Sequence, residues 1–135
     1  MSFDFSYRKL NVYNLSKELV QDVYGAVSLF PKTEQYALGD QLRRAVVSVP
    51  SNIAEGTTRQ SSKEHYHFLE IAFGSLMETI CQMEIANSLS YISQEKYNEI
   101  ECKIIRVYKM LSAMQSTLKN RIESDRPQAV NICKR

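Results

Sequence analysis

The sequence predicts an all-α protein, an antiparallel up-down-up-down four-helix bundle with a kinked second helix. Apolar residues recur at intervals of three and four in four long blocks, which is the spacing of an amphipathic helix. The chain contains 4 glycines and 3 prolines, too few for the many turns of an all-β fold. The segments between the blocks are short, about two to six residues, and this favours antiparallel neighbours.

The first helix is expected from about Val12 to Phe30. It ends at Phe30 because a residue that precedes a proline, here Pro31, avoids the helical conformation. Its predicted core face consists of Leu15, Leu19, Val23 and Ala26.

The second helix is expected to begin at Lys32 or Thr33 and to end at Gly56, a residue type favoured just after a helix. Pro50 lies inside it, where a proline removes one backbone donor and costs about 3 kcal/mol in a regular helix. The helix therefore either kinks at Pro50 or restarts there, with the proline in its first turn. Its predicted core face consists of Leu38, Leu42, Val46, Val49 and Ile53.

The third and fourth helices begin at recognisable N-caps. Ser61 and Glu64 have the spacing of a capping box, in which the serine accepts a bond from a backbone N–H and the glutamate reaches back. Ser93 is the expected N-cap of the fourth helix. The predicted core faces are Leu69, Phe73, Leu76, Ile80 and Met83 in the third helix, and Tyr97, Ile100, Ile104, Val107, Leu111, Met114 and Leu118 in the fourth.

A single domain is expected, because 135 residues can bury a core without disulfides or metals. The apolar pattern stops near Ser124. Residues 1–124 are therefore predicted to form the bundle and residues 125–135 a mobile C-terminal tail.

Charge and cysteine content restrict the function classes. The formal net charge is +2, which is low for a dedicated nucleic-acid-binding monomer. No secretion signal or membrane-length apolar run is present, so a cytoplasmic protein is expected. The three cysteines are far apart and odd in number, which argues against a disulfide framework or a zinc motif.

The enzyme-like signals are weak. Glu64 and His67 have the Glu-x-x-His spacing of di-iron bundles, but no second copy of the motif exists. No glycine-rich phosphate loop is present. We therefore expect no catalytic residue, metal, cofactor or small-molecule substrate, and a metal-dependent helical-bundle enzyme is only a remote alternative. Aromatic residues such as Phe30, Phe73 and Tyr97 are expected to pack in the core.

The second helix has more apolar surface than one core face requires. Val47, Pro50 and Ala54 share a sector with Arg43, beside the predicted core face. This sector is either an oligomer contact or part of a wide core-facing stripe, and the sequence leaves both open. The predicted oligomer interface consists of Val47, Pro50, Asn52, Ala54 and Glu55.

Several motifs resemble those of the four-helix-bundle proteins encoded in intervening sequences of bacterial 23S rRNA genes. They are Phe30-Pro31-Lys32, Gln41-Leu42-Arg43-Arg44-Ala45, Pro50-x-Asn52-Ile53-Ala54-Glu55-Gly56 with Arg59, and Gly74-Ser75-Leu76 with Glu78. The family is similar to the accessory variability determinant of diversity-generating retroelements. The resemblance implies a ring-like homopentamer without known catalytic activity. For the retroelement relatives it implies binding to nucleic acid and to a reverse transcriptase.

Basic residues are the remaining carriers of a binding activity. Arg43, Arg44, Arg59 and Lys63 are the predicted nucleic-acid-binding residues, and a ring would repeat them around its axis. The expected partners are other copies of the chain, together with RNA or a nucleic-acid-processing protein. The alternative is a scaffold that binds proteins only, in which the arginines form intersubunit salt bridges with Glu55 or Asp40.

Overall fold

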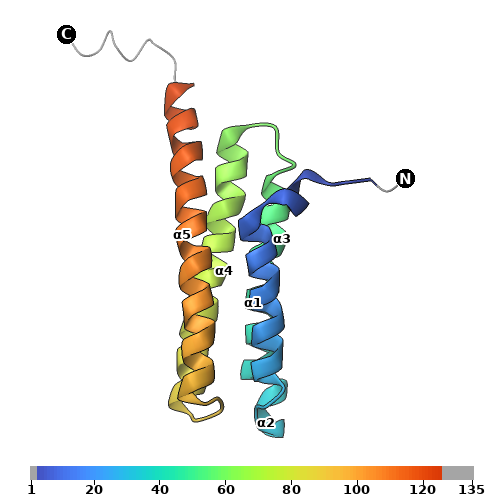
Figure 1. Ribbon diagram of the computed structural model, residues 1–135, viewed down its shortest axis with the longest axis vertical. Helices are drawn as coiled ribbons and strands as arrows, with labels where there is room; N and C mark the ends of the chain where they lie inside the picture. Colours follow the sequence, from blue (N-terminus) through green and yellow to red (C-terminus); the bar gives the residue numbers. More distant parts are fainter. Residues whose placement is uncertain (1–2, 126–135) are drawn as a thin grey trace, which may run out of the picture.

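In the computed structural model, which describes residues 3–125, the chain is entirely helical. Four long helices lie side by side, and a short 3-10 helix precedes them (Figure 1). The elements are η1 (Ser6–Lys9), α1 (Asn11–Val27), α2 (Lys32–Gln35), α3 (Leu38–Gly56), α4 (Ser62–Ser88) and α5 (Gln94–Ser124). The predicted four-helix fold is confirmed. Except for Asp125, the predicted tail lies outside the described residues.

The four long helices pack as a closed ring of neighbours, in which α1 contacts α3 and α5, and α4 contacts the same two helices. Salt bridges from Lys103 on α5 to α1 join one of these pairs, at 2.7 Å from Asp22 and 3.4 Å from Glu18. The hydrogen bond to Asp22 is the main reason why the pKa of Lys103 is raised. No helix within residues 3–125 is long and apolar enough to cross a membrane.

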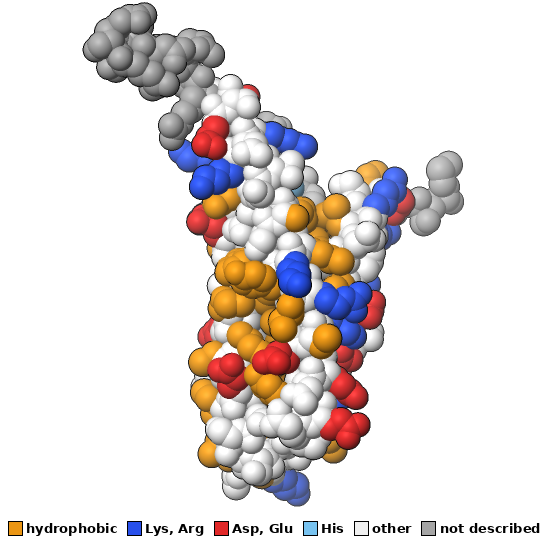
Figure 2. All heavy atoms as spheres, turned by 60° about the vertical axis from the view of Figure 1, so that its left-hand side comes forward, with side chains coloured by type: hydrophobic (Ala, Val, Ile, Leu, Met, Phe, Trp, Pro, Cys, Tyr) orange, Lys and Arg blue, Asp and Glu red, His pale blue; other side chains and the backbone are white. Residues whose placement is uncertain are grey.

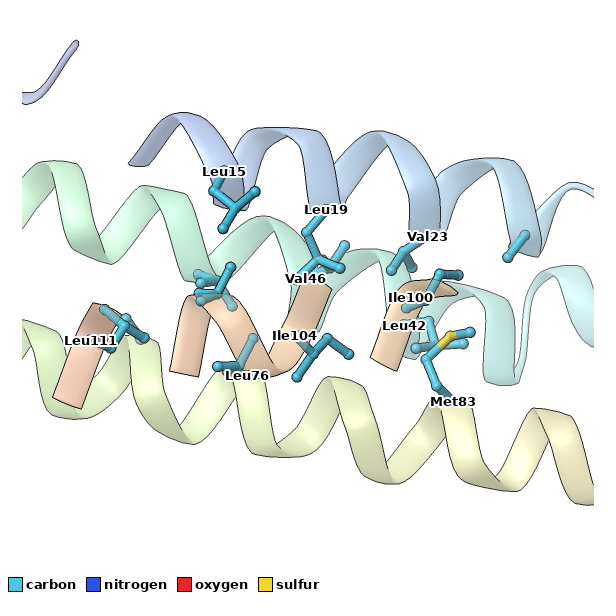
Figure 3. Close-up of a cluster of buried hydrophobic side chains, with 14 of the residues drawn as sticks. Leu15, Leu19, Val23, Leu42, Val46, Leu76, Met83, Ile100, Ile104 and Leu111 are labelled. Atoms are coloured by element: carbon cyan, nitrogen blue, oxygen red, sulfur yellow. The ribbon is translucent and has the colours of Figure 1, made fainter. Parts of the chain in front are cut away.

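The core lies where the four predicted apolar faces meet. In Figure 3, side chains from α1 and α3 point toward those from α4 and α5. The labelled residues are Leu15, Leu19, Val23, Leu42, Val46, Leu76, Met83, Ile100, Ile104 and Leu111, and all of them are buried. Phe73 and Ile80 are half-buried beside this cluster. The three-and-four spacing therefore identified most of the core, and the predicted residues Leu38 and Met114 also lie half-buried at its margin.

The first helix is shorter than expected, and the second is interrupted. α1 ends at Val27, and the side chain of Gln35 donates hydrogen bonds to the carbonyls of Val27 (2.7 Å) and Phe30 (3.1 Å). These bonds hold the turn that follows α1. The predicted second helix breaks into α2 and α3 at Tyr36 and Ala37, whose backbones leave the helical conformation.

α3 continues through Pro50 and is bent by 39°. The predicted kink is therefore confirmed, and the alternative, a restart of the helix at Pro50, is wrong. Since proline has no N–H, the carbonyl of Val46 loses its usual helical partner, which is a known cause of helix bending.

The helix ends confirm the two serine caps and correct the role of Gly56. Ser61 and Ser93 each accept a bond from a backbone N–H three residues later, at 3.1 Å. No reciprocal bond from Glu64 is found among the described residues. Gly56 is the last residue of α3 and does not have a positive φ. It is needed for close packing, because a Cβ there would lie 2.9 Å from Cδ2 of His65.

Candidate nucleic-acid interface

The four predicted basic residues fall at two separate places on the bundle. Arg43 and Arg44 lie in the second turn of α3, whereas Arg59 and Lys63 lie in the connection to α4 and at its start. About four helical turns, roughly 22 Å, separate the two pairs. The structure therefore does not unite them in one cluster.

Arg43 is held by bonds within the chain. Its guanidinium donates to a carboxylate oxygen of Asp40 and to the backbone carbonyl of Gln35, both at 2.6 Å. It thereby connects α2 to α3 across the break between them. Arg43 contributes positive charge to the surface, but its position is set by these two contacts.

Arg59 is also held within the chain. It forms a salt bridge of 2.7 Å with Glu55, and its guanidinium lies 4.4 Å from the centre of the Phe68 ring. These contacts join the end of α3 to the first turns of α4. Because Glu55 neutralises much of its charge, Arg59 is less suited to bind phosphate than its sequence position suggested.

Arg44 and Lys63 differ from the other two. Both are exposed, and neither has an ion-pair partner among residues 3–125. Arg44 lines a surface hollow between α1 and α3, together with Arg43, Asp40 and Tyr24. A cation without a protein partner remains available to bind an anion.

A second hollow continues along the same two helices. It has a volume of about 340 Å³, and Val47 contributes to both hollows, which we together call the α1–α3 groove. Lys17 lies in this second hollow, with its ammonium 5.4 Å from the centre of the Tyr13 ring. The groove thus contains Lys17, Arg43 and Arg44 against the single carboxylate of Asp40.

The sequence interpretation missed Lys17 and the tyrosines of this groove. Tyr13, Lys17, Val20 and Tyr24 recur at helical spacing, so they form one stripe beside the core face of α1. That stripe was a detectable signal. The sequence could not show that this stripe lies close to Arg44, because that depends on how α1 packs against α3.

The residues of the predicted oligomer interface differ in their environments within the chain. Pro50 is buried within the chain and Ala54 is half-buried, whereas Val47 is 39% exposed. Pro50 and Ala54 line the groove with residues of α1, so the apolar sector faces α1. Pro50 therefore belongs to a wide core-facing stripe of α3, one of the two explanations that the sequence left open.

The two polar residues of that predicted interface point to other neighbours. Asn52 donates to the carbonyl (2.8 Å) and the hydroxyl (2.9 Å) of Ser48, and Ser75 of α4 donates to the same hydroxyl at 2.8 Å. Glu55 is occupied by its salt bridge. The five predicted residues therefore do not form one continuous exposed surface.

The histidines on α4 have separate environments. His67 is exposed, and its Nδ1 lies 4.0 Å from a carboxylate oxygen of Glu70. Burial, together with the positive charge of Arg121, lowers the pKa of His65. Within residues 3–125 no three histidine, cysteine or acidic side chains are grouped so that they could hold a metal ion.

The structure is that of a small four-helix-bundle protein in which cations line the α1–α3 groove. The chain belongs to the 23S rRNA-intervening sequence protein family, whose model matches residues 8–113. A crystal structure of a protein of unknown function from the S23 ribosomal protein family of Bacteroides thetaiotaomicron VPI-5482 has the same fold. The two share 24% identity and a TM-score of 0.72, over 77% of this chain and 97% of that one. No curated protein matches the chain.

Proposed function

We propose that the protein is a cytoplasmic, non-enzymatic binding module that assembles from several copies and holds RNA in the α1–α3 groove. The excess of cations in that groove is the observation that supports the proposal. Lys17, Arg43 and Arg44 face one carboxylate, so the groove carries as much net positive charge as the whole chain. The rest of the chain is neutral overall.

A polynucleotide is the ligand that best matches this distribution of charge. Its phosphates condense counterions, and a protein cation that replaces them gains free energy through their release. Two or three cations give weak binding. A ring of several copies would repeat the groove around its axis and strengthen the attraction for a single RNA molecule.

The test is charge reversal in the groove. The double variant Lys17→Glu, Arg44→Glu should lose most of its affinity for RNA at low salt, as measured by fluorescence anisotropy. The matched control is Arg106→Glu, Lys109→Glu, which makes the same change of net charge at exposed positions on α5. Equal affinity in the two double variants would contradict the proposal.

Assembly would use the apolar surface of the last two helices. Ile105 and Tyr108 on α5 are exposed, and the Tyr108 ring lies 5.0 Å from that of the half-buried Phe73 on α4; we call these three residues the α4–α5 face. Figure 2, in which α5 comes forward, shows hydrophobic side chains gathered at mid-height. Exposed apolar side chains gain free energy when another subunit covers them. Resemblance to the family suggests five copies in a ring.

The second proposal is that the protein is a scaffold that binds only other proteins. A nucleic-acid-processing enzyme would be one such partner. The sequence suggested a scaffold in which the arginines form salt bridges with Asp40 or Glu55 of a neighbouring subunit. Both pairs are formed within the chain, as Arg43–Asp40 and Arg59–Glu55. That form therefore loses its support, and the scaffold would have to use the α4–α5 face.

A further inference from the structure

Four aromatic rings form a continuous row at the start of the chain. The ring centres of Phe3 and Phe5 are 4.7 Å apart, those of Phe5 and Tyr7 are 5.9 Å apart, and those of Tyr7 and Tyr13 are 4.8 Å apart. We call Phe3, Phe5, Tyr7 and Tyr13 the aromatic row. It connects the segment before η1 to the first turn of α1.

The outer end of the aromatic row is exposed, whereas Tyr13, at its inner end, packs against the core. Phe3 is 75% exposed and Phe5 is 47% exposed, whereas Tyr7 and Tyr13 are half-buried. Phenylalanine is usually buried, and two adjacent exposed rings are unfavourable in water. Their exposure suggests that a ligand covers them.

Cations accompany the aromatic row along its length. The guanidinium of Arg8 lies 4.9 Å from the centre of the Phe5 ring, and the ammonium of Lys17 lies 5.4 Å from that of Tyr13. Lys9 is exposed in the same short helix. Asp4 is the one carboxylate in the segment from Phe3 to Lys17.

The row leads directly into the α1–α3 groove. Tyr7 and Tyr13 line the hollow that contains Lys17 and Val47. The adjoining hollow, which shares Val47, contains Arg44 and Tyr24, whose side chain is 45% exposed. One path from Phe3 to Tyr24 therefore carries exposed and half-buried rings together with cations.

We infer that this path binds single-stranded nucleic acid, with bases stacked on the aromatic rings and phosphates held by Lys17 and Arg44. The inference rests on the proposed function, because it names the ligand class of the same groove. Base–aromatic stacking tolerates any sequence, and a cationic groove follows the backbone. A duplex is excluded, because its bases are stacked on each other and are not available to the rings.

A second copy of the chain could also cover exposed rings. The charges favour nucleic acid over a protein surface, because cations outnumber carboxylates along the whole path. Lys17, Arg43 and Arg44 lie in the groove with the single carboxylate of Asp40, and Arg8 lies over the Phe5 ring. A subunit contact would show itself as a change of molecular mass in solution.

The experiment compares a short labelled RNA without secondary structure, the DNA of the same sequence, and the matching RNA duplex. Phe5→Ala and Tyr24→Ala should each weaken single-strand binding at least about fivefold, the lower end of what one stacked base contributes. Phe5→Tyr and Tyr24→Phe should restore it, because they keep a ring. The control is Tyr36→Ala, a ring that is 84% exposed and lies outside the groove.

The salt dependence provides a second measurement. If Lys17 contacts a phosphate, Lys17→Gln should lower the slope of log affinity against log salt by about 0.7 for a single strand. Phe5→Ala should leave that slope unchanged, because a stacked ring releases no counterion.

The outcomes separate this inference from the proposed function. Equal binding of single strand and duplex, or unchanged single-strand affinity in Phe5→Ala and Tyr24→Ala, would overturn the inference and leave RNA binding standing. If no nucleic acid binds, both are wrong. If Phe5→Ala changes the molecular mass in solution and not the affinity, the aromatic row is a subunit contact and the inference is overturned.

Discussion

Single residues show why charge in a sequence is a poor measure of charge at a surface. Arg43 and Arg59 are as basic as Arg44, yet each is bonded to a carboxylate within the chain. Exposed pairs of this kind contribute little to stability, on the order of 0–1 kcal/mol. Their main effect is to remove two of the four predicted cations from competition for a phosphate.

His65 should make the stability of the fold depend on pH. Its side chain packs against Gly56, and Nε2 is buried without a hydrogen-bond partner among residues 3–125. Burial lowers the pKa of His65 below the ordinary value of 6.5. As the pH falls below 6.5, the unfolded chain binds a proton before the folded one does, so the free energy of unfolding should decrease.

The measurement is urea denaturation at several pH values on both sides of 6.5. His65→Gln should show a weaker decrease in the free energy of unfolding as the pH falls. The control is His67→Gln, since His67 is an exposed histidine on the same helix. The same pH dependence in His65→Gln and in the parent protein would contradict the argument.

Helix boundaries depended on local chemistry that is only partly visible in sequence. The serine caps of α4 and α5 were predicted correctly, because an N-cap bond involves residues three apart in the chain. The break between α2 and α3 was missed. Bonds from Gln35 and Arg43 stabilise that region, and they depend on the turn that follows α1.

The N-cap of α5 should contribute to the stability of the fold. Ser93→Ala removes the acceptor for the N–H of Lys96 and should lower the free energy of unfolding by about 1 kcal/mol. Ser93→Asp keeps an acceptor at the helix N-terminus and should retain most of the stability. Urea denaturation measures both, and equal losses in the two variants would show that the cap is not the cause.

The arrangement of the whole molecule explains why α3 has a wide apolar surface. A helix in a closed ring of four has two helical neighbours, so its buried stripe is wide. Val47, Pro50 and Ala54 lie on the side of α3 that faces α1. Other apolar side chains remain exposed, among them Ile105 and Tyr108 on α5.

Assembly should depend on the α4–α5 face. Ile105→Glu places a charge in the α4–α5 face and should reduce the molecular mass in solution, as measured by light scattering at several protein concentrations. Tyr36→Glu introduces the same charge elsewhere on the surface and is the control. If Val47→Glu dissociates the assembly and Ile105→Glu does not, the interface lies on α3 instead. If the parent protein is a monomer, the proposal of assembly is wrong.

The fold class, most of each core face and two of the helix caps could be predicted from the sequence. Each of these depends on residues three or four apart, which helical geometry brings onto one face. The burial of Pro50 against α1, and the groove that Lys17 and Arg44 share with the exposed Tyr24, depend on the tertiary structure. Those contacts join residues on different helices, and no periodicity within one helix encodes them.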